Sequence, residues 1–117
     1  MRSSPKVPKH RRARKIFKLA KGYRGRRSKI YRMAKQQVAK AGNASFVGRK
    51  ERKREFRRLW IARISAAVKN HGMNYSTFIN GLLKAGIKLD RKQLSELAIN
   101  DPETFKTILE EAKKHAA

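Results

Sequence analysis

Apolar side chains in the second half of the chain recur at helical spacing and lie between clear start and stop signals. Three segments are expected to be short helices. Asn74 is placed to cap the first, which Gly86 ends; Asp90–Gln93 has capping-box spacing; and Asp101-Pro102 is an N-cap followed by proline at the first helical position. Their apolar faces are Tyr75, Phe78, Ile79, Leu82 and Leu83; Leu94, Leu97 and Ala98; and Phe105, Ile108, Leu109 and Ala112.

A longer helical pattern precedes them, over Arg49 to Asn70, and Gly72 is expected to end it. Its apolar stripe consists of Phe56, Trp60, Ile64, Ala67 and Val68. The main interpretation is that this stripe packs in a core. The alternative is that Phe56 and Trp60 stack on nucleic-acid bases.

The first 50 residues carry only thin apolar stripes. Residues 1–9 are expected to be irregular, and a short basic helix is expected from Lys9 to Lys21. The glycines of Lys21–Gly25 break it, and helical spacing resumes over Arg26–Ala41. Whether the helix stops, bends or continues between Gly42 and Gly48 is left open.

No segment alternates as a half-buried strand does, and no internal repeat is present. The fold class expected is therefore all-α, with a long basic helical N-terminal extension and a small C-terminal helical bundle. We place the extension at residues 1–56 and the globular domain at residues 57–117.

Charge divides the chain in the same way. Residues 1–69 hold 25 of the 32 lysines and arginines but only two of the eight acids, Glu51 and Glu55. The remaining 48 residues are almost neutral, within a total net charge of +24. A segment with so few apolar residues and so much like charge is expected to stay largely unfolded until a polyanion neutralises it. This footprint indicates a nucleic-acid partner.

The residue mix favours structured RNA over duplex DNA. Arginine is abundant, and its planar guanidinium suits phosphates, guanine edges and stacking. Tyr23, Tyr31 and Phe46 lie among the cations and can stack on unpaired bases, which RNA offers more often. For Tyr23, packing on its own turn is an equal alternative. Gly22 and Gly25 allow the backbone to approach a sugar-phosphate chain closely.

Other function classes find little support. The chain has no cysteine, and its three histidines are scattered, so no metal site and no cofactor is expected. No nucleophile stands at a useful distance from a base, and there is no glycine-rich phosphate loop, so no enzyme is expected. No run is long and apolar enough to span a membrane, and no secretory signal is expected. An organellar transit peptide is a less favoured interpretation.

Three blocks of sequence stand out as a set: Leu19–Gly25, Phe56–Ile64 and Asn74–Leu82. They resemble the bacterial-type ribosomal protein L20 family of the large subunit, and the resemblance extends over roughly residues 9–115. It implies a long helical extension threaded into RNA, a small helical C-terminal domain, direct binding of 23S ribosomal RNA, and a role in early assembly of the large subunit. Neighbouring large-subunit proteins become expected partners, and the chain's own messenger RNA a further one, through autoregulation by the C-terminal domain. The expected location is the ribosome of the cytoplasm, with an organellar ribosome less favoured.

The resemblance also implies particular RNA contacts. It assigns them to Lys21, Gly22, Tyr23, Arg24, Gly25, Arg49, Arg52, Lys53, Arg54, Arg57 and Arg58, and more weakly to Asn80, Arg91 and Lys92. The charge pattern adds Arg11, Arg12, Arg14, Lys15, Lys18, Arg26, Arg27, Lys29, Arg32 and Lys50. The chain departs from the family at Ala44–Gly48, where it lacks an aromatic residue and an Arg-Asp pair. Two rival functions are an architectural DNA-binding protein and a repressor acting chiefly on messenger RNA.

Overall fold

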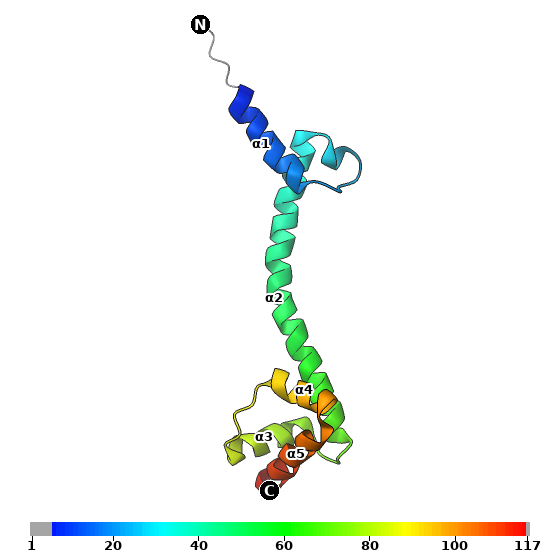
Figure 1. Cartoon of the computed structure of the whole chain (residues 1–117), viewed down its shortest axis with the longest axis vertical. Coiled ribbons are helices and arrows are strands. Elements are labelled where there is room, and N and C mark those ends of the chain that lie inside the picture. The colour runs from blue at the N-terminus through cyan, green and yellow to red at the C-terminus, as the bar shows by residue number, and fades with distance from the viewer. Residues whose placement is uncertain (1–5, 117) are drawn as a thin grey trace. The chain divides into compact units, whose positions relative to one another are not determined.

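The computed structural model describes residues 6–116, in which every regular element is a helix (Figure 1). The elements in chain order are α1 (Lys6–Leu19), the 3-10 helix η1 (Gly25–Ser28), α2 (Tyr31–Lys69), α3 (Tyr75–Ala85), α4 (Arg91–Asn100) and α5 (Pro102–Ala116). The all-α prediction is confirmed. The chain divides into two compact units, Met1–Lys50 and Glu51–Ala117, and the division falls within α2.

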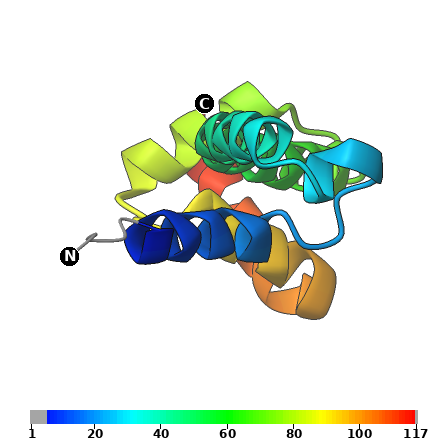
Figure 2. The ribbon, with the colours of Figure 1, turned by 90° about the horizontal axis from the view of Figure 1, so that it is seen from above.

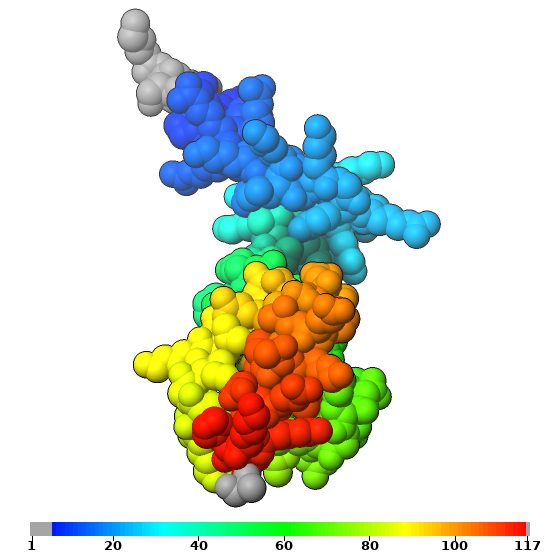
Figure 3. Space-filling view, turned by 60° about the horizontal axis from the view of Figure 1, so that its bottom comes forward, coloured from blue at the N-terminus to red at the C-terminus, as the bar shows by residue number. Residues whose placement is uncertain are grey.

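The second unit has the hydrophobic core of the chain. Figure 3 shows α5 and α4 covering one of its faces, in red and orange. The buried core side chains are Ile64 and Val68 of α2, Phe78 and Leu82 of α3, Leu94 of α4, and Phe105, Leu109 and Ala112 of α5. The rings of Phe78 and Phe105 lie 5.7 Å apart between centroids, a usual distance for a packed aromatic pair. Four helices therefore share one core, as the stripes predicted.

A glycine sets how closely two of these helices approach. Gly81 is buried where α3 packs against α5. A Cβ atom built on Gly81 would lie 2.3 Å from the backbone oxygen of Ala112 and 2.9 Å from its carbonyl carbon. Because both atoms belong to the backbone, no side-chain rotation can make room for a methyl group. The contact therefore requires glycine at this position.

The helix ends lie where the stop signals placed them. α2 and α3 each end with a backbone hydrogen bond that reaches back across a glycine. The Met73 N–H donates to the Val68 oxygen at 3.2 Å, and the Ile87 N–H donates to the Leu82 oxygen at 3.0 Å. At the start of α4, the Asp90 N–H donates to Oε1 of Gln93 at 3.0 Å, one half of the expected capping box.

Asp101 precedes α5 as the N-cap. Its Oδ1 atom accepts a hydrogen bond from the Thr104 N–H at 3.2 Å, and its Oδ2 atom one from the Thr104 hydroxyl. Two hydrogen bonds to the charged form lower the pKa of the Asp101 carboxyl from its ordinary value, the side-chain bond having the larger effect. The Asn74 side chain, by contrast, makes no capping bond, although Asn74 occupies the N-cap position of α3.

The first unit has only a very small packed interior. Ala20 and Ala34 are fully buried, and the rings of Phe17 and Tyr31 meet edge to face at 6.3 Å. Figure 2 shows η1 and its flanking loops joining α1 to α2, in lighter blue. With no larger apolar residue buried among residues 6–50, packing contributes little to the stability of this unit.

Two expected boundaries in this unit need correction. Residues 6–9, expected to be irregular, are the first part of α1, since a proline is tolerated in the first turn of a helix; residues 1–5 lie outside the described residues. The helix expected over Arg26–Ala41 instead begins at Tyr31, because Gly25–Ser28 forms the 3-10 turn. The Ser28 hydroxyl donates to the Gly25 oxygen at 3.1 Å within that turn.

The sequence left open whether the helix stops, bends or continues between Gly42 and Gly48, and the structure shows that it continues. α2 runs through both glycines without interruption. The Ser45 hydroxyl donates to the Ala41 oxygen at 2.9 Å, and the Lys50 ammonium lies 4.4 Å from the centre of the Phe46 ring. Helix-forming alanine, lysine and arginine flank the glycines and offset their cost of about 1 kcal/mol each. The departure from the family pattern at Ala44–Gly48 therefore does not break the helix.

The core predictions fail at three positions. Phe56 is 49% exposed and Leu83 is 79% exposed, although both fall on the apolar stripes. Trp60 is half-buried but is not part of the core cluster. None of the three belongs to the core cluster, so helical periodicity alone overestimated the buried face.

Candidate nucleic-acid interface

The described residues offer no membrane span and no metal site. No helix among residues 6–116 is both long and apolar enough to cross a bilayer. Within the same residues, no group of three or more histidine, cysteine, aspartate or glutamate side chains could hold a metal ion.

α1 presents a cationic surface without acids. The site residues predicted on it are all exposed: Arg11, Arg12, Arg14, Lys15 and Lys18. No aspartate or glutamate occurs anywhere in residues 1–50, so these charges have no carboxylate of their own unit to pair with. Exposed, unpaired cations spaced along a helix can each meet a phosphate.

The loop after α1 takes its shape from two glycines. Gly22 has a φ of +89° and Gly25 a φ of +69°, values that residues with side chains rarely adopt. Between them the Tyr23 N–H donates to the Ala20 oxygen at 3.0 Å. No atom lies within 4 Å of a Cβ built on either glycine, so their backbone faces open space where a sugar-phosphate chain could approach. The remaining cations predicted here are exposed: Lys21, Arg24, Arg26, Arg27, Lys29 and Arg32.

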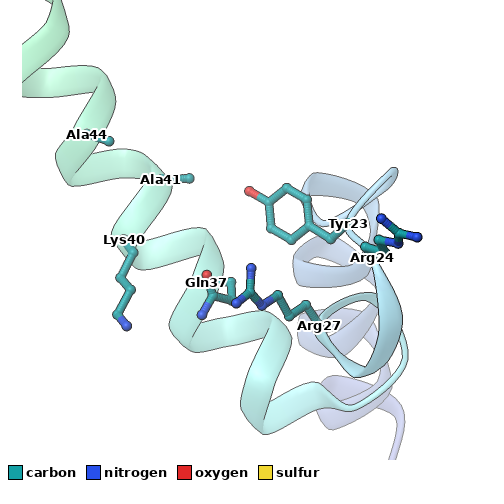
Figure 4. Close-up of a pocket in the computed structure, with 7 residues that line it drawn as sticks. All are labelled: Tyr23, Arg24, Arg27, Gln37, Lys40, Ala41 and Ala44. Carbon is teal, nitrogen blue, oxygen red and sulfur yellow. The ribbon is translucent and has the colours of Figure 1, made fainter.

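Tyr23 faces a hollow between this loop and α2 (Figure 4). The hollow has a volume of about 440 Å³ and is lined by Tyr23, Arg24, Arg27, Gln37, Lys40, Ala41 and Ala44. The half-buried tyrosine ring points toward the alanines of α2, while Arg27 extends toward Gln37. Sequence reasoning identified Tyr23, Arg24 and Arg27, but not Gln37 or Lys40, which reach the hollow only because α2 begins at Tyr31 and returns past the loop.

The middle of α2 carries the densest cationic run. Its predicted site residues are exposed: Arg49, Lys50, Arg52, Lys53, Arg54, Arg57 and Arg58. An ion pair joins Arg58 to Glu55 at 3.1 Å, with both side chains largely exposed, so it stabilises the helix only slightly. Two acids among these cations leave most of their charge available to a ligand.

The second unit brings together cations that are far apart in sequence. A hollow of about 510 Å³, here named the Trp60 groove, is lined by Lys53, Arg54, Arg57, Trp60, Asp90, Arg91 and Lys92. The predicted residue Asn80 is exposed on α3 and does not line it. The sequence offered one signal for the groove, because Trp60 follows Lys53 and Arg57 at helical spacing.

A comparison with protein families decides the identity of the chain. The family model described as ribosomal protein L20 matches residues 2–108. The chain belongs to the ribosomal protein L20 family. The resemblance seen in the sequence blocks is thus confirmed.

Relatives match over nearly their full length. The chain is 54% identical over 116 residues to the large ribosomal subunit protein bL20 of Hydrogenobaculum sp., covering 99% of this chain and 96% of that protein. It is 61% identical to protein bL20c of Pyropia yezoensis, covering 92% of each, and 56% identical to bL20 of Methylibium petroleiphilum, covering 91% and 90%. The ribosomal protein L20 family consists of structural ribosomal proteins and not enzymes, so the chain is a ribosomal component without catalytic activity, as expected.

Proposed function

We propose that this chain binds 23S ribosomal RNA directly, as a structural component of the large ribosomal subunit that is needed early in its assembly. It takes no part in the chemistry of protein synthesis. The observation that carries the proposal is the first unit, where an acid-free, exposed cationic surface surrounds an interior of two buried alanines.

Direct RNA binding is supported by how those charges are presented. The cations of α1, of the Lys21–Gly25 loop and of α2 are exposed, and residues 1–50 contain no acid to neutralise them. Each phosphate contact releases condensed counterions, so a long cationic surface gains affinity with every nucleotide it covers. The open backbone at Gly22 and Gly25 and the Tyr23 hollow add places for a sugar or a base.

A role in early assembly follows from the same composition. A unit with so little apolar interior is stabilised mainly by its ligand, so it becomes ordered as RNA folds around it. We assign residues 1–56 to this RNA-binding extension and residues 57–117 to a globular domain that meets neighbouring large-subunit proteins. A chain whose folding depends on RNA has to bind before the surrounding RNA has finished folding.

Salt-dependent binding tests the proposal. The full-length chain is titrated with a 23S ribosomal RNA transcript, and with duplex DNA, at several salt concentrations. The Arg26→Gln/Arg27→Gln double variant should flatten the log-salt slope by about two units, roughly one per lost phosphate contact. The control pair Lys84→Gln/Lys106→Gln removes two exposed charges from the second unit and should leave the slope almost unchanged. Tighter binding to duplex DNA than to the transcript at equal salt would favour an architectural DNA-binding protein instead.

The assembly role is tested in cells. Depletion of the chain should cause incomplete large-subunit particles to accumulate, while ribosomes already assembled continue translation. If depletion slowed translation at once and left subunit assembly intact, the assembly role would be wrong.

Autoregulation is a second candidate function, favoured by the Trp60 groove. The groove lies in the second unit alone, which has its own core, so this unit has the means to bind RNA without the first. We propose that the C-terminal domain represses translation of the chain's own messenger RNA. Expression of residues 51–117 should lower output from a reporter fused to the chain's own leader, and not from an unrelated leader.

A further inference from the structure

The side chain of Trp60 stands apart from the core of its unit. It is half-buried, although the apolar stripe of α2 predicts a core position. The Phe56 ring lies 6.0 Å from it between centroids, at 32° between planes, and is itself 49% exposed. The two rings form a packed aromatic pair on α2. Because Trp60 lines the groove, the part of the indole that stays exposed offers an apolar surface to a ligand there.

The surroundings of this indole are strongly cationic. Lys53, Arg54 and Arg57 line the groove from α2, and Arg91 and Lys92 line it from the start of α4. The lining contains one acid, Asp90, against these five cations. Its carboxylate repels phosphate, so phosphates are directed toward the cations on α2.

Arg91 is held in place by a neutral group. Its Nε atom donates a hydrogen bond of 2.9 Å to the hydroxyl of Tyr75, which packs against the core. This bond orients the guanidinium without neutralising it, unlike an ion pair with a carboxylate. The terminal nitrogens remain able to donate to an incoming acceptor. An oriented, charged guanidinium that lines the same groove as a partly exposed indole is the kind of arrangement that recognises a base together with its phosphate.

We propose that the Trp60 groove binds a single unpaired RNA nucleotide, whose base stacks on the indole while its flanking phosphates meet the cations of α2 and α4. This inference rests on the proposed function and adds to it a defined site and a class of RNA structure, a bulged or looped-out nucleotide. The groove volume of about 510 Å³ lies in the range of small-ligand pockets.

The chemistry favours RNA over an acidic protein segment. An acidic peptide would satisfy the five cations but leave the indole without a flat partner. A base-paired stem offers phosphates, but its bases are already stacked within the helix. An unpaired nucleotide supplies both groups at once, and base–aromatic stacking tolerates any base because each has a π face.

Trp60 itself provides the measurement, because it is the single tryptophan of the chain. The full-length protein is titrated with two RNA hairpins, one with a bulged nucleotide in its stem and one with that nucleotide paired. We expect the bulged hairpin to quench tryptophan emission to saturation. The paired hairpin should bind through the basic surface and leave the emission nearly unchanged.

Substitutions separate stacking from folding. Trp60→Leu should weaken binding of the labelled bulged hairpin by roughly 5- to 150-fold, from the usual range for one stacked base, and leave binding of the paired hairpin unaltered. Trp60→Phe retains an aromatic face and should restore most of the preference. Arg54→Gln should weaken bulge binding, whereas Arg63→Gln removes the same charge from an exposed position of α2 outside the groove and should not.

The outcomes distinguish this site from the general function. Equal quenching by both hairpins, or by poly-glutamate, would overturn the stacking proposal while leaving RNA binding intact. Equal loss of bulge binding in the Leu and Phe variants would also overturn it. Failure to bind either hairpin would contradict the proposed function as well.

Discussion

At the scale of single residues, two helical glycines, Gly81 and Gly48, have very different surroundings. Gly81 lets α3 lie against the carbonyl of Ala112 on α5, at a distance that a methyl group cannot share. Gly48, in contrast, is a helical glycine with no atom within 4 Å of its would-be Cβ. The same substitution at these two glycines thus has opposite consequences.

We predict that Gly81→Ala lowers the free energy of unfolding by about 1–3 kcal/mol, because overpacking outweighs the gain in helix propensity. Gly48→Ala should be neutral or stabilise α2 by up to about 1 kcal/mol. Thermal and urea unfolding of the full-length variants, followed by circular dichroism, measures both. A stable Gly81→Ala variant would contradict the close approach of α3 and α5.

Asp101 makes the stability of the second unit depend on pH. Hydrogen bonds from Thr104 lower the pKa of its carboxyl in the folded chain, so the native state favours the carboxylate. The stability this provides is complete above the unfolded pKa and is lost as the pH falls through the lowered folded value. The melting temperature of Asp101→Asn should therefore lie below that of the unmodified chain at pH 7, and the two should converge toward pH 2. A difference that persisted undiminished at pH 2 would show that charge is not involved.

At the scale of elements, α2 changes its role along its length. Its last turns contribute Ile64 and Val68 to the core, whereas Trp60, about one turn before Ile64, and Phe56, about two turns before it, lie outside the core. The continuous helix carries both roles, with its cationic turns preceding its buried ones. Burial on this helix depends on what packs against each turn and not on the stripe itself.

This division predicts an unusual order of mutational effects. Ile64→Ala should destabilise the second unit by about 2–5 kcal/mol, because it leaves a cavity in the core. Trp60→Ala removes a larger side chain yet should cost less than Ile64→Ala, because the indole is only half-buried. Chemical denaturation of both variants provides the comparison. A greater loss at Trp60 would place the indole in the core after all.

The elements also show how far sequence patterns reach. Gly72 and Gly86 predict where α2 and α3 stop, and Asp101 predicts where α5 starts, because caps and stops act through neighbouring residues. Exposure of Leu83 could not be predicted, because it depends on which face of α3 the later helix α5 covers. Continuity across Gly48 was likewise undecidable, since propensity alone leaves the balance close to even.

One part of the candidate site could also be predicted from the sequence, and another part could not. The acid-free cations of residues 1–50 are visible in the sequence because charge needs no fold to be counted. The Trp60 groove is not, because Asp90, Arg91 and Lys92 meet Trp60 only after α3 has reversed the chain. Family resemblance assigned RNA contacts to Arg91 and Lys92, whereas the sequence offered Trp60 only as an alternative stacking residue and did not place the three in one groove.

At the scale of the whole molecule, the two units differ in what stabilises them. The second has a shared core of four helices, while the first buries two alanines under a surface of like charges. We expect residues 51–117 to fold alone with a cooperative thermal transition. Residues 1–50 should show little helix at low salt until RNA is added, as followed by far-ultraviolet circular dichroism. Strong helicity of that fragment without RNA would show that charge repulsion does not limit it.

The absence of carboxylates from residues 1–50 has a consequence for the cell. If the first unit binds RNA as proposed, a newly made copy without its ribosomal site is expected to attach to other RNA, because this segment has no internal counter-charge. We expect surplus copies to be harmful as well as wasteful. A cell that makes this chain therefore gains from matching its synthesis to the supply of ribosomal RNA, and from degrading the remainder quickly.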